Sequence, residues 1–326
     1  MKNNSNISNQ IHSKICPLCS SITNQMLAKE LRRGNGEVCY CAACDHGFLV
    51  QNEQIDAKTY YAKHYRKEYS HNAEAAATNA RELFEVYRNY QEARLKIINP
   101  VLTSSTRLLE VGASSGQFLT HIKDRIDLVN AIELDKACCA FLNDELNIQT
   151  DSEYLENSMF ANEKYEVVCA FQVMEHVEAP VSFLKGLRRA TKPGGSIFIE
   201  VPNLRDPLLS VWDVVSYQKF FFHSAHLHYF TENSLRQVAL EAGFQPDEIE
   251  INFTQDYNLL NHLHWIMNDG PQSNCHIGLN KVSFIGRNSE VATWLTQEMI
   301  ELNSRYVAKL IAGKCTSNMM MTLIKK

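Results

Sequence analysis

Residues 108–133 carry the pattern that most constrains the fold of this chain. An apolar run at 108–111 has strand character and leads into a glycine turn at 112–116, and apolar residues at 118–122 begin a helix. A second apolar run, at 128–132, ends in Glu133. This order predicts the first β-α-β unit of a nucleotide-binding α/β sheet. In such a unit the glycines let the backbone approach a ligand, and the acid can bind two ribose hydroxyls.

The glycine turn also restricts the ligand. A dinucleotide-binding turn needs three glycines in the pattern G-x-G-x-x-G. This turn has only Gly112 and Gly116, with Ser114 and Gln117 at the other two positions. A P-loop would need Gly-Lys-Ser/Thr at its end, whereas Gly116 is followed by Gln117 and Phe118. The turn therefore gives little support to phosphate binding.

The same turn resembles motif I of the S-adenosylmethionine-dependent methyltransferases with the Rossmann-like fold, E-x-G-x-G-x-G, with Ser114 at the middle glycine. Three later segments match the family in order and spacing: YEVVCAFQVMEHVE at 165–178, RRATKPGGSIFIEVPN at 188–203 and TENSLRQVALEAGF at 231–244. The resemblance covers about residues 85–255 and implies an α/β, seven-stranded Rossmann-like sheet. It also implies a cofactor site formed by Glu110, Gly112, Ser114, Gly116, Glu133, Asp151, Phe171 and Gln172.

Two C-x-x-C pairs near the N-terminus predict a metal site. Cys16 and Cys19 form the first pair, and Cys41 and Cys44 follow after 21 intervening residues. Four thiolates at this spacing are typical of a closed, structural Zn²⁺ site. Cys39 and His46 are alternative ligands, because each lies two residues from a member of the second pair. The residues between the pairs carry mixed charges, which favours a rigid block beside an active site over a nucleic-acid reader.

The sequence suggests a division of the chain into a disordered tail (1–14), a zinc module (15–55), a helical linker or cap (56–100), a methyltransferase domain (101–288) with a lid insertion (204–230), and a C-terminal helix (289–326). The final strand is expected at 281–287.

The polar N-terminus lacks the apolar core of a signal peptide, and no run of 18 apolar residues occurs, so we expect a cytoplasmic protein with no membrane span. Residues 101–326 have 19 Lys and Arg against 27 Asp and Glu, which disfavours a nucleic-acid partner.

Two groups of histidines are expected at the carboxyl ends of the strands, where open α/β sheets hold their active sites. Glu175 and His176 follow the fourth strand, and His223, His226 and His228 end the lid insertion. Histidine has a pKa suited to removing a proton from a methyl acceptor. We therefore expect catalytic roles for His226, His176, Glu175 and His223, with His226 as the preferred base. A second metal at the three lid histidines is disfavoured, because no carboxylate accompanies them at suitable spacing.

The lid segment and the cysteine pairs together resemble bacterial deoxysugar C-methyltransferases, whose lid reads Y-H-E-H-L-S-Y-F-S. The corresponding residues, 223–231, keep the second histidine as His226, but His223 replaces the tyrosine and Ala225 the glutamate. That family's third domain is missing here or reduced to a helix. The departures leave room for an O- or N-methyl acceptor.

The sequence therefore predicts a zinc-containing methyltransferase for a small polar acceptor, most simply a sugar, a sugar nucleotide or an intermediate of a natural product or glycan. A zinc-ribbon methyltransferase of RNA or protein is one alternative. A non-catalytic cofactor-binding partner subunit is another. A homo-oligomer is compatible with the sequence, and the missing third domain would give a second subunit a place at the acceptor site.

Overall fold

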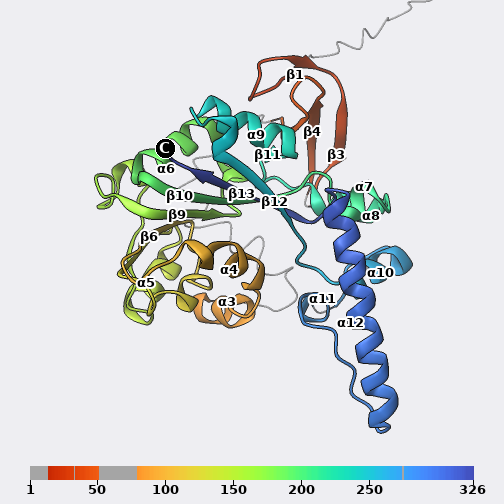
Figure 1. Cartoon of the computed structure of the whole chain (residues 1–326). Helices are drawn as coiled ribbons and strands as arrows, with labels where there is room; N and C mark the ends of the chain where they lie inside the picture. Colours follow the sequence, from red (N-terminus) through yellow and green to blue (C-terminus); the bar gives the residue numbers. More distant parts are fainter. Residues whose placement is uncertain (1–13, 33, 51–78, 274) are drawn as a thin grey trace, which may run out of the picture.

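The computed structural model describes residues 14–32, 34–50, 79–273 and 275–326 (Figure 1). Its centre is a seven-stranded sheet in the order β12-β13-β10-β9-β6-β7-β8. Strands β10, β9, β6, β7 and β8 are parallel, and β13 runs antiparallel to both of its neighbours. The strands are β6 (Arg107–Val111), β7 (Leu128–Ile132), β8 (Gln149–Asp151), β9 (Tyr165–Phe171), β10 (Thr191–Pro202), β12 (Ile249–Thr254) and β13 (Asn318–Ile324). The predicted seven-stranded α/β sheet is confirmed.

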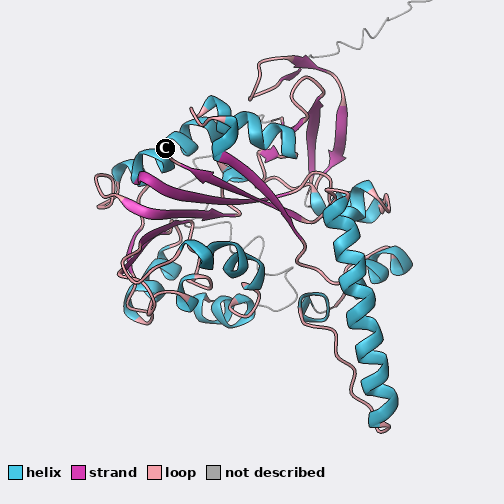
Figure 2. Ribbon diagram, viewed as in Figure 1, coloured by secondary structure: helices cyan, strands magenta, loops and turns pink. Residues whose placement is uncertain are grey.

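Helices cover both faces of this sheet, so the central strands are mostly apolar and are buried along nearly their whole length (Figure 2). One face packs against α6 (Pro180–Ala190) and α9 (Glu232–Glu241), and the other lies toward α3 (Ala80–Tyr87), α4 (Glu92–Ile98) and α5 (Lys136–Asp144). Asp135 caps α5 by accepting bonds from two backbone N–H groups, and Thr231 with Ser234 forms a capping box at α9. Short 3-10 helices are η1 (Asn99–Val101), η2 (Leu119–His121), η3 (Leu155–Asn157), η4 (Met174–His176) and η5 (Pro246–Glu248).

Two local expectations differ from the structure. The helix expected after Gly116 is only the 3-10 turn η2. The strand expected at 281–287 is irregular throughout, and Ile285 is fully exposed there. The last strand is instead β13, whose three methionines are buried between β10 and β12. Because β13 belongs to the sheet, the sheet continues past the expected domain boundary at residue 288.

A helical insertion separates β12 from β13. It consists of α10 (Leu259–Asn268), α11 (Cys275–Leu279) and α12 (Ser289–Ala312), and α12 projects from the body of the molecule (Figure 1). The helix expected at 289–312 is α12. None of the described helices combines the length and apolar character that crossing a bilayer requires.

The cysteine-rich module forms a second sheet with the lid. Its strands are β3 (Met26–Glu30), β4 (Asn35–Cys41), β5 (His46–Leu49) and the lid strand β11 (His228–Tyr229), and a separate pair joins β1 (Lys14–Ile15) to β2 (Ile22–Thr23). The lid also contains α7 (Pro207–Ser210) and α8 (Val215–Phe221). Leu31 and Val38 of the module pack with Tyr217, Phe221 and Tyr229 of the lid. Module and lid therefore share one apolar core. Residues 1–13 of the expected tail and residues 56–78 of the expected linker lie outside the described residues.

Candidate cofactor and acceptor site

A cavity of about 1190 Å³ opens at the carboxyl ends of β6, β7 and β9. Most of the predicted site residues line it: Glu110, Gly112, Ser114, Glu133, Phe171, Gln172, Glu175, His176, His223 and His226. Gly116 and Asp151 are not among the described lining residues. Asp151 accepts a hydrogen bond from the Met159 backbone N–H at 2.7 Å, so its side chain holds the loop after β8.

The glycine turn adopts the left-handed conformation that the motif requires. Gly112 has φ +77°, and a Cβ there would lie 2.3 Å from Val173 Cγ2. Gly116 has φ +79°, and its Cβ would lie 2.5 Å from Leu142 Cδ2. The absence of a side chain at Gly112 thus lets the backbone approach Val173 closely at the cavity, whereas at Gly116 it lets α5 pack against the turn. Ser114 has φ +49°, a conformation that glycine adopts more easily.

Glu133 holds this turn in place. Its Oε2 accepts from the Ser114 N–H at 2.6 Å, and its Oε1 accepts from the Asp135 N–H at 2.7 Å. Each carboxylate oxygen can accept a further hydrogen bond. The carboxylate can therefore organise the turn and still bind the two hydroxyls of a ribose.

Glu110 offers a second acid at the cavity wall. Only 3% of its surface is exposed, and Oε2 has no hydrogen-bond partner among the described residues. Burial raises the pKa of Glu110 to about 8. A cationic ligand group would satisfy this oxygen, and S-adenosylmethionine carries an α-ammonium. The turn, Glu133 and Glu110 together fit that cofactor.

A partly buried ion pair forms the adjacent wall, and the sequence analysis did not identify it. Arg94 of α4 donates from Nε to both carboxylate oxygens of Glu200 on β10, at 3.2 and 3.1 Å. Gln172 Nε2 donates to Glu200 Oε1 at 3.0 Å, and the Arg94 guanidinium lies 4.6 Å from the centroid of the Phe171 ring. The pair fixes Gln172 and Phe171 at the carboxyl end of β9. Arg94 and Glu200 are 106 residues apart, so no local sequence pattern reveals them.

The predicted histidines meet on the acceptor side of the cavity. His176 and His226 have ring centroids 4.7 Å apart, and those of His223 and His226 are 3.7 Å apart. His176 Nδ1 lies 2.7 Å from the Ala225 carbonyl oxygen, a contact that leaves Nε2 to accept a proton. Glu175 Oε1 lies 3.8 Å from His176 Nε2 and 3.9 Å from His226 Nε2. The fold thus supplies the carboxylate that the lid segment lacks in sequence, and these three side chains could also hold a cation.

Burial controls the charges of this group. It raises the pKa of Glu175 to about 8 and lowers the pKa of His176 to about 4. The pKa values of His226 and His223 also lie well below the ordinary value, mainly through burial and further through neighbouring positive charge, including that of Arg32. At neutral pH the histidines are therefore uncharged and able to accept a proton.

Arg32 comes from the cysteine-rich module and lines the same cavity. Its backbone N–H donates to the Phe222 carbonyl at 2.7 Å, and its Nε donates to the Phe220 carbonyl at 2.6 Å. The guanidinium also lies 3.7 Å from the centroid of the Phe220 ring. The sequence showed only mixed charges between the cysteine pairs, but packing of the module on α8 brings Arg32 to the acceptor side.

The four predicted zinc ligands lie together. Their sulfur atoms are all within 4.8 Å of one another, with Cys16 and Cys44 Sγ 3.6 Å apart and Cys19 and Cys41 Sγ 3.5 Å apart. A tetrahedral Zn²⁺ with Zn–S bonds of about 2.3 Å needs sulfur atoms about 3.8 Å apart, so the cluster fits the ion. His46, one alternative ligand, instead lies with Nε2 3.0 Å from His228 Nδ1 of the lid. Cys39, the other alternative, is absent from this group of described residues.

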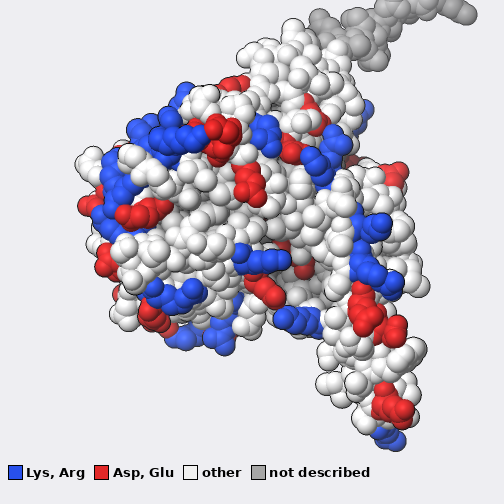
Figure 3. Space-filling model, in the orientation of Figure 1, with Lys and Arg blue, Asp and Glu red and all other residues white. Residues whose placement is uncertain are grey.

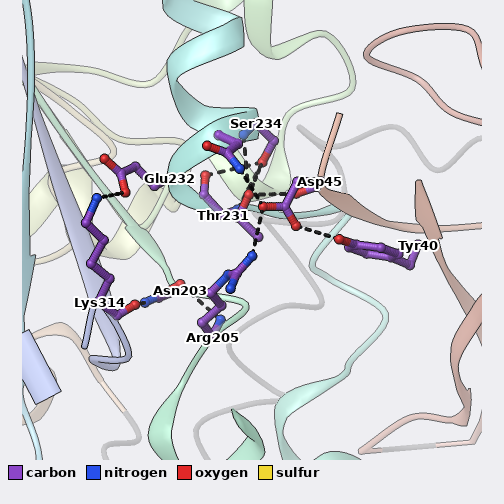
Figure 4. Close-up of polar contacts among 9 residues, drawn as sticks. Tyr40, Asp45, Asn203, Arg205, Thr231, Glu232, Ser234 and Lys314 are labelled. Atoms are coloured by element: carbon purple, nitrogen blue, oxygen red, sulfur yellow. Dashed lines mark hydrogen bonds and ion pairs between the residues drawn. The ribbon is translucent and has the colours of Figure 1, made fainter. Parts of the chain in front are cut away.

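The second cysteine knuckle is bonded to the domain through Asp45 (Figure 4). Its carboxylate accepts from Tyr40 Oη at 2.6 Å and from Arg205 Nη2 at 3.1 Å, and its carbonyl accepts from Thr231 Oγ1 at 2.7 Å. Thr231 is the cap of α9, and Arg205 begins the lid. The knuckle is thus tied to both ends of the lid insertion.

A family model described as a methyltransferase domain matches residues 61–249. The chain belongs to this methyltransferase family. The chain is also similar to the mitochondrial ubiquinone biosynthesis O-methyltransferase of Dictyostelium discoideum, with 28% identity over 214 residues, covering 53% of this chain and 66% of the relative. The ubiquinone biosynthesis O-methyltransferase of Pseudomonas entomophila (strain L48) is 28% identical over 113 residues, covering 33% of this chain and 48% of the relative. The methyltransferase thus spans just under two thirds of the first relative and about half of the second.

Solved structures support the same fold. A methyltransferase in complex with the Haloferax volcanii Trm112 methyltransferase activator aligns with a TM-score of 0.50 and 11% identity, covering 78% of this chain and 97% of that chain. At this identity the likeness concerns the fold alone. The predicted Rossmann-like S-adenosylmethionine-dependent methyltransferase domain is confirmed, whereas the resemblance to deoxysugar C-methyltransferases stays a prediction.

Proposed function

We propose that the protein transfers a methyl group from S-adenosylmethionine to a hydroxyl of a small polar acceptor, such as a sugar or a biosynthetic intermediate. The observation that carries this proposal is the group of neutral histidines and a buried acid beside the glycine turn. Both curated relatives are named O-methyltransferases, which supports a hydroxyl acceptor. The departures at His223 and Ala225 from the C-methyltransferase lid support the same choice.

In the proposed cofactor site, Glu110 near the end of β6 and Glu133 after β7 both contact the ligand. Glu133 would bind the ribose hydroxyls, and Glu110 would face the ammonium group, which would hold the Glu110 carboxylate in its charged form. Gly112 and Ser114 would line the turn against the ligand, with Phe171 and Gln172 on the neighbouring strand. The cofactor supplies an activated methyl group on a sulfonium. The protein's remaining task is to orient the acceptor, exclude water and remove a proton.

His226 is the proposed base. Its neutral imidazole would accept the hydroxyl proton as the oxygen becomes nucleophilic, and His176, held through Nδ1 by Ala225, would orient the acceptor. Glu175 lies within 4 Å of both rings, and in its ionised form its carboxylate would stabilise the imidazolium that forms. His223 packs against His226 and limits its movement.

We also propose that Cys16, Cys19, Cys41 and Cys44 bind one structural Zn²⁺. Four thiolates leave no open position for water, so the ion would stabilise the module and take no part in the methyl transfer. Because β5 pairs with β11, a folded module would fix the lid that carries His223 and His226. The cytoplasmic location also stays a proposal.

Purified protein should be incubated with methyl-labelled cofactor and a panel of sugars, sugar nucleotides and hydroxylated aromatic compounds. We expect label in a low-molecular-weight product, at an oxygen atom, and a large loss in His226→Asn. Label found only in RNA or protein would support the zinc-ribbon alternative and contradict this proposal. Tight cofactor binding with no transfer to any fraction of a cell extract would support the non-catalytic alternative.

A further inference from the structure

Helix α12 exposes several large apolar side chains to solvent. Its 24 residues extend roughly 36 Å, and Leu310 is its only buried residue. Five of the large hydrophobic side chains that are exposed in the described chain lie on this helix: Val291, Trp294, Ile300, Leu302 and Ile311. Trp294 is 60% exposed on this helix, and Val291 and Leu302 are also exposed. Val291, Trp294 and Leu302 lie on the same side of the helix, and exposed apolar side chains gathered on one side mark an interaction site more often than a solvated face.

The helix contacts the body through a different set of residues. Tyr306 Oη accepts from Trp212 Nε1 at 3.0 Å and lies 2.8 Å from His262 Nδ1. Asn303 Oδ1 accepts from the Leu259 N–H at 2.8 Å. The exposed side chains recur at three- and four-residue intervals along a separate flank of the helix. This flank consists of Val291, Trp294, Glu298, Leu302, Arg305 and Lys309.

Charge is divided along the same flank. Glu298 lies in the N-terminal half and Arg305 and Lys309 in the C-terminal half, with Glu290 and Glu301 nearby adding to the acidic part. Figure 3 shows blue side chains on the part of the projecting helix nearer the body, red ones farther out, and a further blue group at the far tip of the projection. A flank that is acidic at one end and basic at the other complements a second copy of itself in the antiparallel direction.

We propose that α12 pairs with α12 of a second copy of this chain, antiparallel, across a two-fold axis near residues 301 and 302. In this register Glu298 faces the partner's Arg305, and Trp294 faces the partner's Lys309. By symmetry each contact forms twice, and the two Leu302 side chains lie beside the axis. The pair combines a central apolar contact with ion pairs and cation–π contacts at its ends. The proposed pairing of the two helices does not depend on which molecule accepts the methyl group.

The test is the mass of the full-length protein in solution, measured by sedimentation equilibrium over a range of concentrations. We expect a reversible dimer for the wild type. Leu302→Glu should be monomeric, because it places two acidic groups beside the axis. Trp294→Lys should also be monomeric, because each new ammonium group would face the partner's Lys309. Ile300→Glu is the matched control, since Ile300 is comparably exposed but lies on the opposite side of the helix, and it should remain dimeric.

A charge exchange tests the register. Glu298→Arg alone and Arg305→Glu alone should each raise the dimer dissociation constant about 5- to 30-fold, because two ion pairs become two repulsions. The double variant Glu298→Arg/Arg305→Glu should restore dimerisation. Far-UV circular dichroism and cofactor binding establish that each variant is folded. A wild type that stays monomeric at all concentrations overturns the proposal, and so does a double variant no better than the single ones.

Discussion

Replacing Glu133 tests the assignment of the cofactor site most directly. In the structure both carboxylate oxygens accept backbone hydrogen bonds, from Ser114 and Asp135. Each carboxylate oxygen has two lone pairs, and we assign one further hydrogen bond at each to a ribose hydroxyl. A hydrogen bond to a charged group contributes about 1.5–3 kcal/mol, so losing two would weaken binding by about 10²- to 10⁴-fold. Glu133 is only partly buried, which places the expected loss in the lower half of that range.

The measurement is calorimetric titration with S-adenosylhomocysteine, the demethylated product. Glu133→Ala should bind at least about 100-fold more weakly. Glu133→Gln keeps one acceptor oxygen and should lose about 10-fold. The control is Asp144→Asn, which removes an exposed acid from the end of α5, outside the described lining residues. If folded Glu133→Ala binds within about threefold of wild type, the ribose is held elsewhere and the assignment is wrong.

Four further predictions follow from the site. His226→Asn should lower turnover by about 10²- to 10⁴-fold in the labelled-methyl assay while cofactor affinity, measured by calorimetry, stays nearly constant; near-normal turnover would exclude it as the base. The pH profile of kcat/KM should show no inflection near 6.5, because the His176 pKa is lowered to about 4 and that of His226 lies well below its ordinary value. The rate should instead rise as Glu175 ionises near its pKa of about 8, and Glu175→Gln should lack this rise. Metal analysis should give one zinc per chain, reduced in Cys41→Ser and retained in Cys39→Ser; the reverse result would correct the ligand set. Ser114→Gly should leave thermal stability unchanged or raise it, since glycine adopts the positive φ at that position more easily; a large drop in melting temperature would contradict this reasoning.

The local motifs of this protein were readable from the sequence. The glycine turn with its acid, the two C-x-x-C knuckles and the alternation of strands and helices each occupy a short stretch of chain. Their residues meet because a glycine turn or a knuckle sets the local geometry, and the pairing of neighbouring strands brings in partners that lie within about 30 residues along the chain. The fold class and the four clustered cysteines could therefore be predicted without long-range information.

The composition of the acceptor side depended on contacts that only the tertiary structure defines. Glu175 meets His226 because the lid insertion folds back over the end of β9, and Arg32 reaches them from a module 188 residues before its contact at Phe220. The last strand was misplaced for the same reason. An apolar run becomes a strand only where a neighbouring strand has unpaired backbone groups. The free edges of β10 and β12 pair with β13, so residues 281–287 have no strand to pair with among the described residues. Sequence patterns encode local geometry, whereas partners distant in the chain are chosen by the packing of the whole domain.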